Sequence, residues 1–192
     1  SHACAVTTAG ALYCWGYGGG GQLGDGSAVS RTSPVRAGTD SDWQAVDVGG
    51  THTCAVKTNG SLYCWGENRT GQLGDGTTVR KLTPQRVGTD TNWQAVSAGT
   101  QHTCGLRTGG SLSCWGKNGY GELGDGSGGV KSTPVRIGAG SGWLKTAAGS
   151  GHTCSLRSDR AVYCSGTNMG GTIGDGSGEN RKVQVQAGSD LV

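Results

Sequence analysis

The 192-residue sequence contains no phenylalanine, three prolines and one methionine, and only 15% of its residues are charged. No apolar run approaches the roughly 18 residues of a membrane-spanning segment, so we expect no membrane span. The net charge of +3 is too small to indicate a nucleic-acid partner, and none is expected. The 40 glycines would suit a disordered chain, but six tryptophans, eight cysteines and a strict internal repeat argue against disorder.

One unit of 50 residues recurs four times along the chain. Each copy opens with a histidine, at His2, His52, His102 and His152. A Gly-Gln-Leu-Gly-Asp-Gly block follows at 21–26, with counterparts at 71–76, 121–126 and, altered, at 171–176. A fixed period of this length is typical of solenoids, propellers and repeat arrays. We therefore expect one array with repeats at 1–42, 43–92, 93–142 and 143–192, the first without its first strand.

Each repeat contains two cysteines ten positions apart, flanking a turn. Thr58-Asn59-Gly60 is typical of a three-residue hairpin loop with glycine in the left-handed conformation. The hairpin then pairs Cys54 with Cys64 at a non-hydrogen-bonded position, with Cα atoms about 4.5 Å apart, within reach of a disulfide. We predict four disulfides, each stabilising by about 2.8 kcal/mol. The pairs are Cys4 with Cys14, Cys54 with Cys64, Cys104 with Cys114, and Cys154 with Cys164.

Two further strands are predicted in each repeat. The segment 43–49 begins with Trp43 and recurs at 93–99 and 143–149, and the segment 83–87 recurs at 33–37, 133–137 and 183–187. Proline at the second position of the latter, as in Pro84, suits an edge strand. Four short strands in every repeat, with no helical periodicity, predict an all-β fold of the β-propeller type. In the fourth hairpin Arg160 replaces the turn glycine, so that turn should be strained or rearranged.

The succession His-Thr-Cys, Tyr-Cys-Trp-Gly, Gly-Gln-Leu-Gly-Asp-Gly and Thr-Pro-Val-Arg resembles the regulator of chromosome condensation (RCC1) repeat over essentially the whole chain. Two cysteines per repeat resemble the secreted, mostly bacterial branch of that family. The resemblance implies a seven-bladed propeller, which needs about 350 residues at this period. Three interpretations follow: part of a longer propeller, a subunit whose open ends are completed by other chains, or a closed four-bladed ring. Any targeting segment is expected to have been removed or to lie outside these residues.

The recurrent histidines, cysteines and aspartates have either a metal-binding or a structural role. His52, Cys54 and Cys64 would supply three zinc ligands, but no fourth ligand recurs at a fixed spacing. The histidine is instead expected to bond to backbone near a blade junction. Gly-Asp-Gly lacks the alternating oxygen ligands of a calcium loop, so the aspartate is expected to bond its own backbone in a tight turn. We expect no metal, cofactor or catalytic residue.

Basic residues recur at one position in the loop after Gly-Asp-Gly, namely Arg31, Lys81, Lys131 and Arg181. Equivalent loops emerge on one face of a propeller, so these residues form either a partner-binding arc or ordinary solvated loops. The window 17–20 and its counterparts vary between repeats, which suits partner specificity. Asn59 and Asn68 match the N-glycosylation pattern.

The sequence therefore predicts a non-enzymatic, extracellular scaffold that binds other proteins, including possible further copies of itself. Paired cysteines favour an oxidising compartment, so the nucleotide-exchange activity known in the nuclear branch of the resembled family is not expected. The alternative is a structural subunit that assembles through open repeat ends into an extracellular fibre or ring.

Overall fold

The computed structural model describes residues 1–188, which form fifteen strands and one short 3-10 helix, η1. The predicted start of another tryptophan strand after Asp190 lies outside the described residues. The elements, in chain order, are β1 (His2–Val6), β2 (Leu12–Gly16), β3 (Arg31–Arg36), β4 (Trp43–Val48), β5 (His52–Lys57), β6 (Leu62–Gly66), β7 (Lys81–Arg86), β8 (Trp93–Ala98), β9 (His102–Arg107), β10 (Leu112–Gly116), β11 (Lys131–Arg136), β12 (Trp143–Ala148), β13 (His152–Arg157), β14 (Val162–Gly166), η1 (Met169–Gly171) and β15 (Arg181–Gln186).

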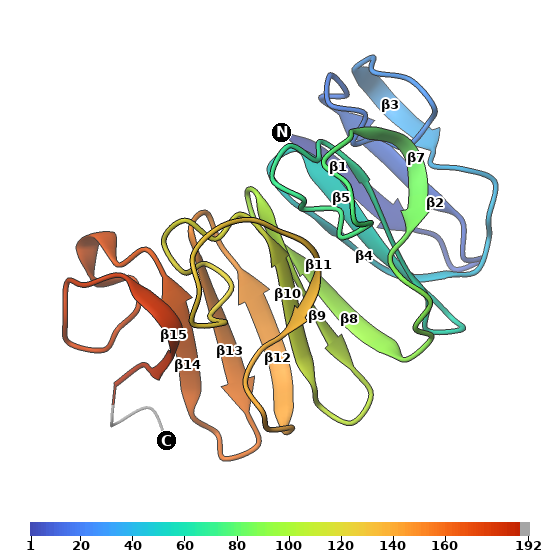
Figure 1. Ribbon diagram of the computed structural model, residues 1–192. Helices are drawn as coiled ribbons and strands as arrows, with labels where there is room; N and C mark the ends of the chain where they lie inside the picture. Colours follow the sequence, from blue (N-terminus) through green and yellow to red (C-terminus); the bar gives the residue numbers. More distant parts are fainter. Residues whose placement is uncertain (189–192) are drawn as a thin grey trace.

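The strands form four antiparallel sheets that follow one another along the chain (Figure 1). The first sheet contains β1 to β3, and the second, third and fourth contain β4 to β7, β8 to β11 and β12 to β15. Figure 1 shows them side by side in an open arc. The prediction of an open all-β array is confirmed, and the closed four-bladed ring is wrong for residues 1–188. An arc results because each sheet packs only on its neighbours.

The central hairpin of each repeat has the register that the turn predicts. In the second sheet Cys54 lies opposite Cys64, the Lys57 amide donates to the Ser61 carbonyl at 2.9 Å, and Gly60 has a φ of 76°. The structure contains a disulfide in each of the four hairpins, between the same cysteine pairs that the sequence indicates. The Cα atoms of each pair are 4.1 Å apart, closer than the expected distance of about 4.5 Å.

The fourth hairpin keeps the same turn although it lacks the glycine. Arg160 has a φ of 68° and is the one non-glycine residue with a positive φ in the described chain. Its amide donates to the Arg157 carbonyl at 3.0 Å, as the Gly60 amide does to Lys57. Of the two alternatives, strain rather than rearrangement is correct, at a cost of about 1–2 kcal/mol for a side chain in this conformation.

Proline and small residues occupy opposite edges of the sheets. Pro34, Pro84 and Pro134 lie in β3, β7 and β11, the outermost strands, where the missing amide hydrogen costs no ladder bond. The first strands of successive sheets contact one another at the opposite edge. There the Ala98 amide donates to Asp47 Oδ2 at 2.8 Å, and the Ala148 amide donates to Ser97 Oγ at 3.0 Å.

Candidate functional site

The contact between consecutive sheets, here called a junction, has the same apolar construction along the array. At the second junction Cys54, Val56 and Leu62 of the second sheet are fully buried against Trp93 and Trp115 of the third. The two indoles meet with ring centroids 5.8 Å apart at an angle of 65°. Each of the first three disulfides thus belongs to a face that receives aromatic side chains from the following repeat.

A chain of hydrogen bonds runs beside this apolar contact. His52 Nε2 lies 2.8 Å from Thr103 Oγ1 of the next repeat, and that hydroxyl donates to the Gln72 carbonyl at 2.8 Å. Trp115 Nε1 donates to the same carbonyl at 3.0 Å. Because the threonine hydrogen is already used, we assign the histidine proton to Nε2. The expected bond to backbone was wrong: the histidine lies at the junction but bonds a threonine side chain 51 residues away.

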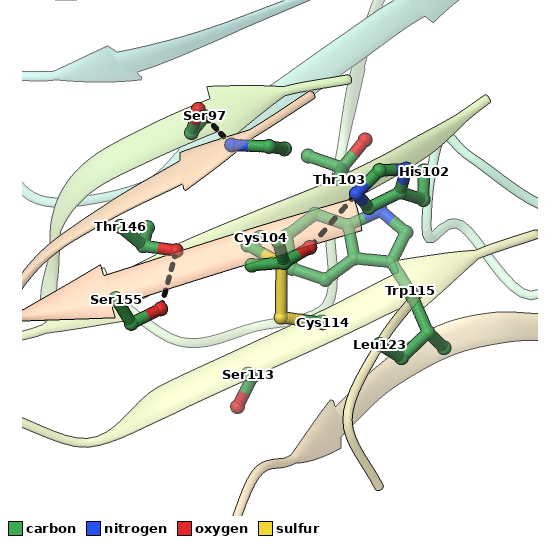
Figure 2. The surroundings of a disulfide bond; sticks show 12 residues. Ser97, His102, Thr103, Cys104, Ser113, Cys114, Trp115, Leu123, Thr146 and Ser155 are labelled. Carbon is green, nitrogen blue, oxygen red and sulfur yellow. Dashed lines mark hydrogen bonds between the residues drawn. A yellow bond between two sulfur atoms is a disulfide. The ribbon is translucent and has the colours of Figure 1, made fainter. Parts of the chain in front are cut away.

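These hydrogen bonds from histidine to threonine to a backbone carbonyl, here called the relay, recur at the three junctions of the described chain. His2 is 2.8 Å from Thr53. His102, which Figure 2 shows near the Cys104–Cys114 disulfide, is 2.9 Å from Thr153. Burial lowers the pKa of His52 from 6.5 to about 3, and the neighbouring histidines His102 and His2 add to this effect. The pKa values of His2 and His102 are likewise lowered to about 4, chiefly by burial. These histidines are therefore neutral at physiological pH and serve the repeat as hydrogen-bond donors.

The fourth sheet presents the same receiving face with no following sheet in the described chain. This open face consists of His152, Cys154, Leu156 and Val162. Its cysteine, leucine and valine are partly exposed, whereas their second-sheet counterparts are fully buried. A depression of about 260 Å³ lies here, lined by Thr146, Ala147, Cys154, Ser155, Leu156, Val162 and the Lys145 stem. Its surface is mainly apolar, so it can receive an aromatic side chain.

Two junction residues are altered at the ends of the array. Ser165 stands where Trp65 and Trp115 stand in the second and third repeats. Gln184 replaces the edge proline in β15, and its Nε2 donates to Ser165 Oγ at 3.1 Å. These two side chains lie beside Gly124, where the indoles of Trp65 and Trp115 lie beside the equivalent glycines at the other junctions. At the other end, Ala3 replaces the relay threonine. The first and fourth sheets are thus not interchangeable copies of the inner ones.

The recurrent basic residues have partners within their own repeats. Arg31 Nη2 lies 2.8 Å from Asp25 Oδ2, and Lys81 and Lys131 lie 3.6 and 3.8 Å from Asp75 and Asp125. Arg181 pairs with Asp175 in the same way. Their charge is balanced locally, which removes the physical basis for an arc of unpaired positive charge. Partner binding by these loops stays a prediction.

The aspartate of each Gly-Asp-Gly block accepts bonds from the residue two positions later. Asp75 Oδ1 accepts from the amide and the hydroxyl of Thr77, at 2.9 and 2.8 Å. Burial raises the pKa of the Asp75 carboxyl, but the bonds from Thr77, with help from Asn68 and Lys81, lower it below its usual value. The sequence-based expectation of a tight turn matches this geometry, which is an Asx turn.

Asn68 is a buried residue in the loop between β6 and β7. Its Nδ2 lies 3.1 Å from Asp75 Oδ1 and 3.0 Å from the Thr77 carbonyl, and its Oδ1 accepts from the Leu73 amide. A glycan on that nitrogen would displace these bonds, and glycosylation at Asn68 stays a prediction. The residue recurs with the 50-residue period as Asn118 and Asn168, both buried. Asn59 lies exposed in its hairpin turn, where glycosylation stays a prediction.

A zinc site of the kind considered would need free cysteine thiolates, but every cysteine is in a disulfide. Within residues 1–188, no three or more histidine, cysteine, aspartate or glutamate side chains converge as a metal site. None of the described helical segments is long and apolar enough to cross a membrane.

Structural comparison places the fold among known RCC1-type proteins. Human WBSCR16 shares 23% identity at a TM-score of 0.87, over 97% of this chain and 50% of that protein. Yeast RCC1 (Prp20), solved with Kap60, shares 20% at 0.87, over 98% and 47%. The ectodomain of the receptor kinase CR4 from Physcomitrella patens shares 21% at 0.53, over 88% and 39%. The chain thus spans about half the length, or less, of these proteins.

Comparison of the sequence alone gives a family but no individual relative. No curated protein matches the chain. The regulator of chromosome condensation (RCC1) repeat matches residues 9–56, 59–106 and 109–156. A second profile of the same repeat matches residues 43–72 and 93–122. Each match to the first profile begins in a hairpin turn and ends in the next sheet, so the sequence unit spans a junction. The chain belongs to the RCC1 repeat family.

Proposed function

We propose that this protein is a non-enzymatic, extracellular scaffold that binds another protein through the open face of its fourth sheet. The observation that carries the proposal is that this face has the same construction as three faces that are covered by following sheets, so a further sheet of the same kind fits it. Three junctions in the same molecule show what such a face receives: one or two aromatic side chains and, on the histidine, a threonine hydroxyl. The docking element of the partner is therefore a sheet resembling an RCC1 repeat.

The disulfides support the extracellular part of the proposal. Four bonds that each close a short hairpin persist in an oxidising compartment and are rare in the cytosol. They also belong to the junction faces, where Cys54 and Cys64 contact the tryptophans of the next repeat. Reduction would therefore loosen both the hairpins and the surfaces that they present.

Assembly of identical copies head to tail is less well supported. The first sheet of a second copy would offer Trp15 to the open face, but it contains no counterpart of Trp43. It also has Ala3 where the relay requires a threonine. Such a contact would lack one indole and the bond to His152, so we favour a partner that supplies both.

The proposal predicts that one further repeat completes the junction. A copy of residues 93–142 joined after Val192 keeps the period, because the copied Trp93 then stands 50 positions after Trp143. We expect the free energy of unfolding, measured by urea denaturation without reductant, to rise by about 3 kcal/mol as two indoles are buried on the open face.

The matched control is the same extended chain with alanine in place of the copied Trp93 and Trp115. It should show little of the gain, since the added repeat then has no side chains for the depression. An equal gain in both extended chains, or no gain in either, would refute docking at this face.

A further inference from the structure

A second hollow lies on a different part of the molecule, where the loops of three repeats meet. Its volume is about 280 Å³, and its lining is polar and apolar in similar measure. Tyr17, Gly19 and Gly20 come from the first repeat, Thr51, Glu67, Arg69 and Gln72 from the second, and Gln101 from the third. Most of these residues belong to the window that varies between repeats, which makes the hollow specific to this pair of loops.

Gly19 and Gly20 line the hollow and place no side chains in it. In the second repeat the position equivalent to Gly20 is Thr70, whose hydroxyl reaches across the junction to the Gln101 carbonyl at 3.0 Å and to Gln72 Oε1 at 2.7 Å. A Cβ at Gly20 would lie 2.9 Å from Glu67 Cγ, 3.0 Å from Gln22 Oε1 and 3.5 Å from the Thr51 carbonyl. At the first junction the Glu67 stem therefore lies beside the space that a threonine bridges at the second, and position 20 adds no side chain to the hollow.

The lining has matched charge and one broad aromatic surface. Glu67 and Arg69 are 3.4 Å apart and balance each other. Tyr17 is 51% exposed, and its hydroxyl lies beside Gly19, where no side chain covers it. Gln72 and Gln101 add amide groups that can both donate and accept. A ligand that fits has no net charge, many hydroxyl groups and one apolar face.

We propose that this hollow binds a neutral sugar ring, with Tyr17 stacked on its C–H face and Glu67, Arg69 and Gln72 bonded to its hydroxyls. The volume of about 280 Å³ is just below the range of about 300 to 1,000 Å³ for ligand pockets, and it suits one ring rather than a long oligosaccharide. This site is separate from the open face of the fourth sheet and does not depend on the function proposed for that face.

The test titrates the intact protein with the methyl glycosides of glucose, galactose, mannose and N-acetylglucosamine, followed by saturation-transfer NMR and calorimetry. At least one glycoside should bind, and Tyr17→Ala should weaken it at least about tenfold. Tyr120→Ala is the matched control, because Tyr120 is 50% exposed on the equivalent loop of the third repeat but does not line the hollow. It should leave the affinity unchanged.

Gly20→Thr provides a second variant, since it copies the side chain found at Thr70 and would displace the flexible Glu67 side chain, whose Cγ lies 2.9 Å from the added Cβ. We expect it to abolish binding while the thermal midpoint stays the same or rises. Binding of none of the four glycosides at 10 mM, equal loss in both tyrosine variants, or binding that survives Gly20→Thr would each overturn the proposal. Leu156→Arg on the open face should leave sugar affinity intact, which separates the two sites.

Discussion

Replacing Trp115 with alanine should destabilise the protein by about 3–5 kcal/mol, the usual cost of removing a large buried aromatic side chain. The indole is fully buried between the second and third sheets, and its Nε1 donates to the Gln72 carbonyl. Alanine would leave a cavity beside Leu73 and Trp93 and leave that carbonyl with the Thr103 hydroxyl alone. Urea denaturation of the non-reduced protein at pH 7 measures the effect.

Trp15 supplies the matched control for this substitution. It occupies the same repeat position, but it lies in the first sheet, has no preceding junction in the described chain and is partly exposed. Trp15→Ala should therefore cost much less, about 1 kcal/mol. Similar costs for the two substitutions would mean that the tryptophan stabilises its own hairpin rather than the junction.

Acid should unfold the protein well above the pH at which its carboxylates titrate. His2, His52 and His102 have pKa values lowered to about 4, 3 and 4, against 6.5 in the unfolded chain. The native state thus binds fewer protons than the unfolded state below pH 6.5. Stability is fully present above that pH and is lost as the pH falls toward 4. With three such groups the unfolding constant should rise by up to about 1,000-fold per pH unit within this window.

Urea denaturation at pH 7, 6 and 5 measures this slope as the number of protons taken up on unfolding. The triple variant His2→Gln, His52→Gln and His102→Gln keeps a side-chain amide donor near each threonine but cannot titrate, so its slope should be nearly flat. Asp25, Asp75, Asp125 and Asp175 also have lowered pKa values, but they affect stability only below about pH 4. If the stability of the unmodified protein stayed constant from pH 7 to 5, the histidines of the relay would not be held neutral by burial.

The features that were predictable from the sequence are those set by neighbouring residues along the chain. A three-residue turn ending in Gly60 fixes the register of β5 and β6, and this register brings Cys54 opposite Cys64. Proline at position 84 likewise restricts β7 to an edge. These follow from local backbone geometry, so one copy of the repeat is enough to derive them.

The features that were missed depend on packing between repeats. The partner of His52 is Thr103, and the carbonyl that Thr103 shares with Trp115 belongs to Gln72. No rule of strand periodicity brings these groups together, because their meeting depends on how one sheet sits against the next.

A double-mutant cycle at the open face tests the account most directly. It measures the cost of Leu156→Ala in the chain itself, in the chain extended by a copy of residues 93–142, and in the extended chain without the two copied tryptophans. We predict a cost below about 1 kcal/mol in the first and third and about 2–4 kcal/mol in the second, where the leucine becomes a buried junction residue. The same cost in all three proteins would show that the fourth sheet does not receive a repeat and would contradict the account.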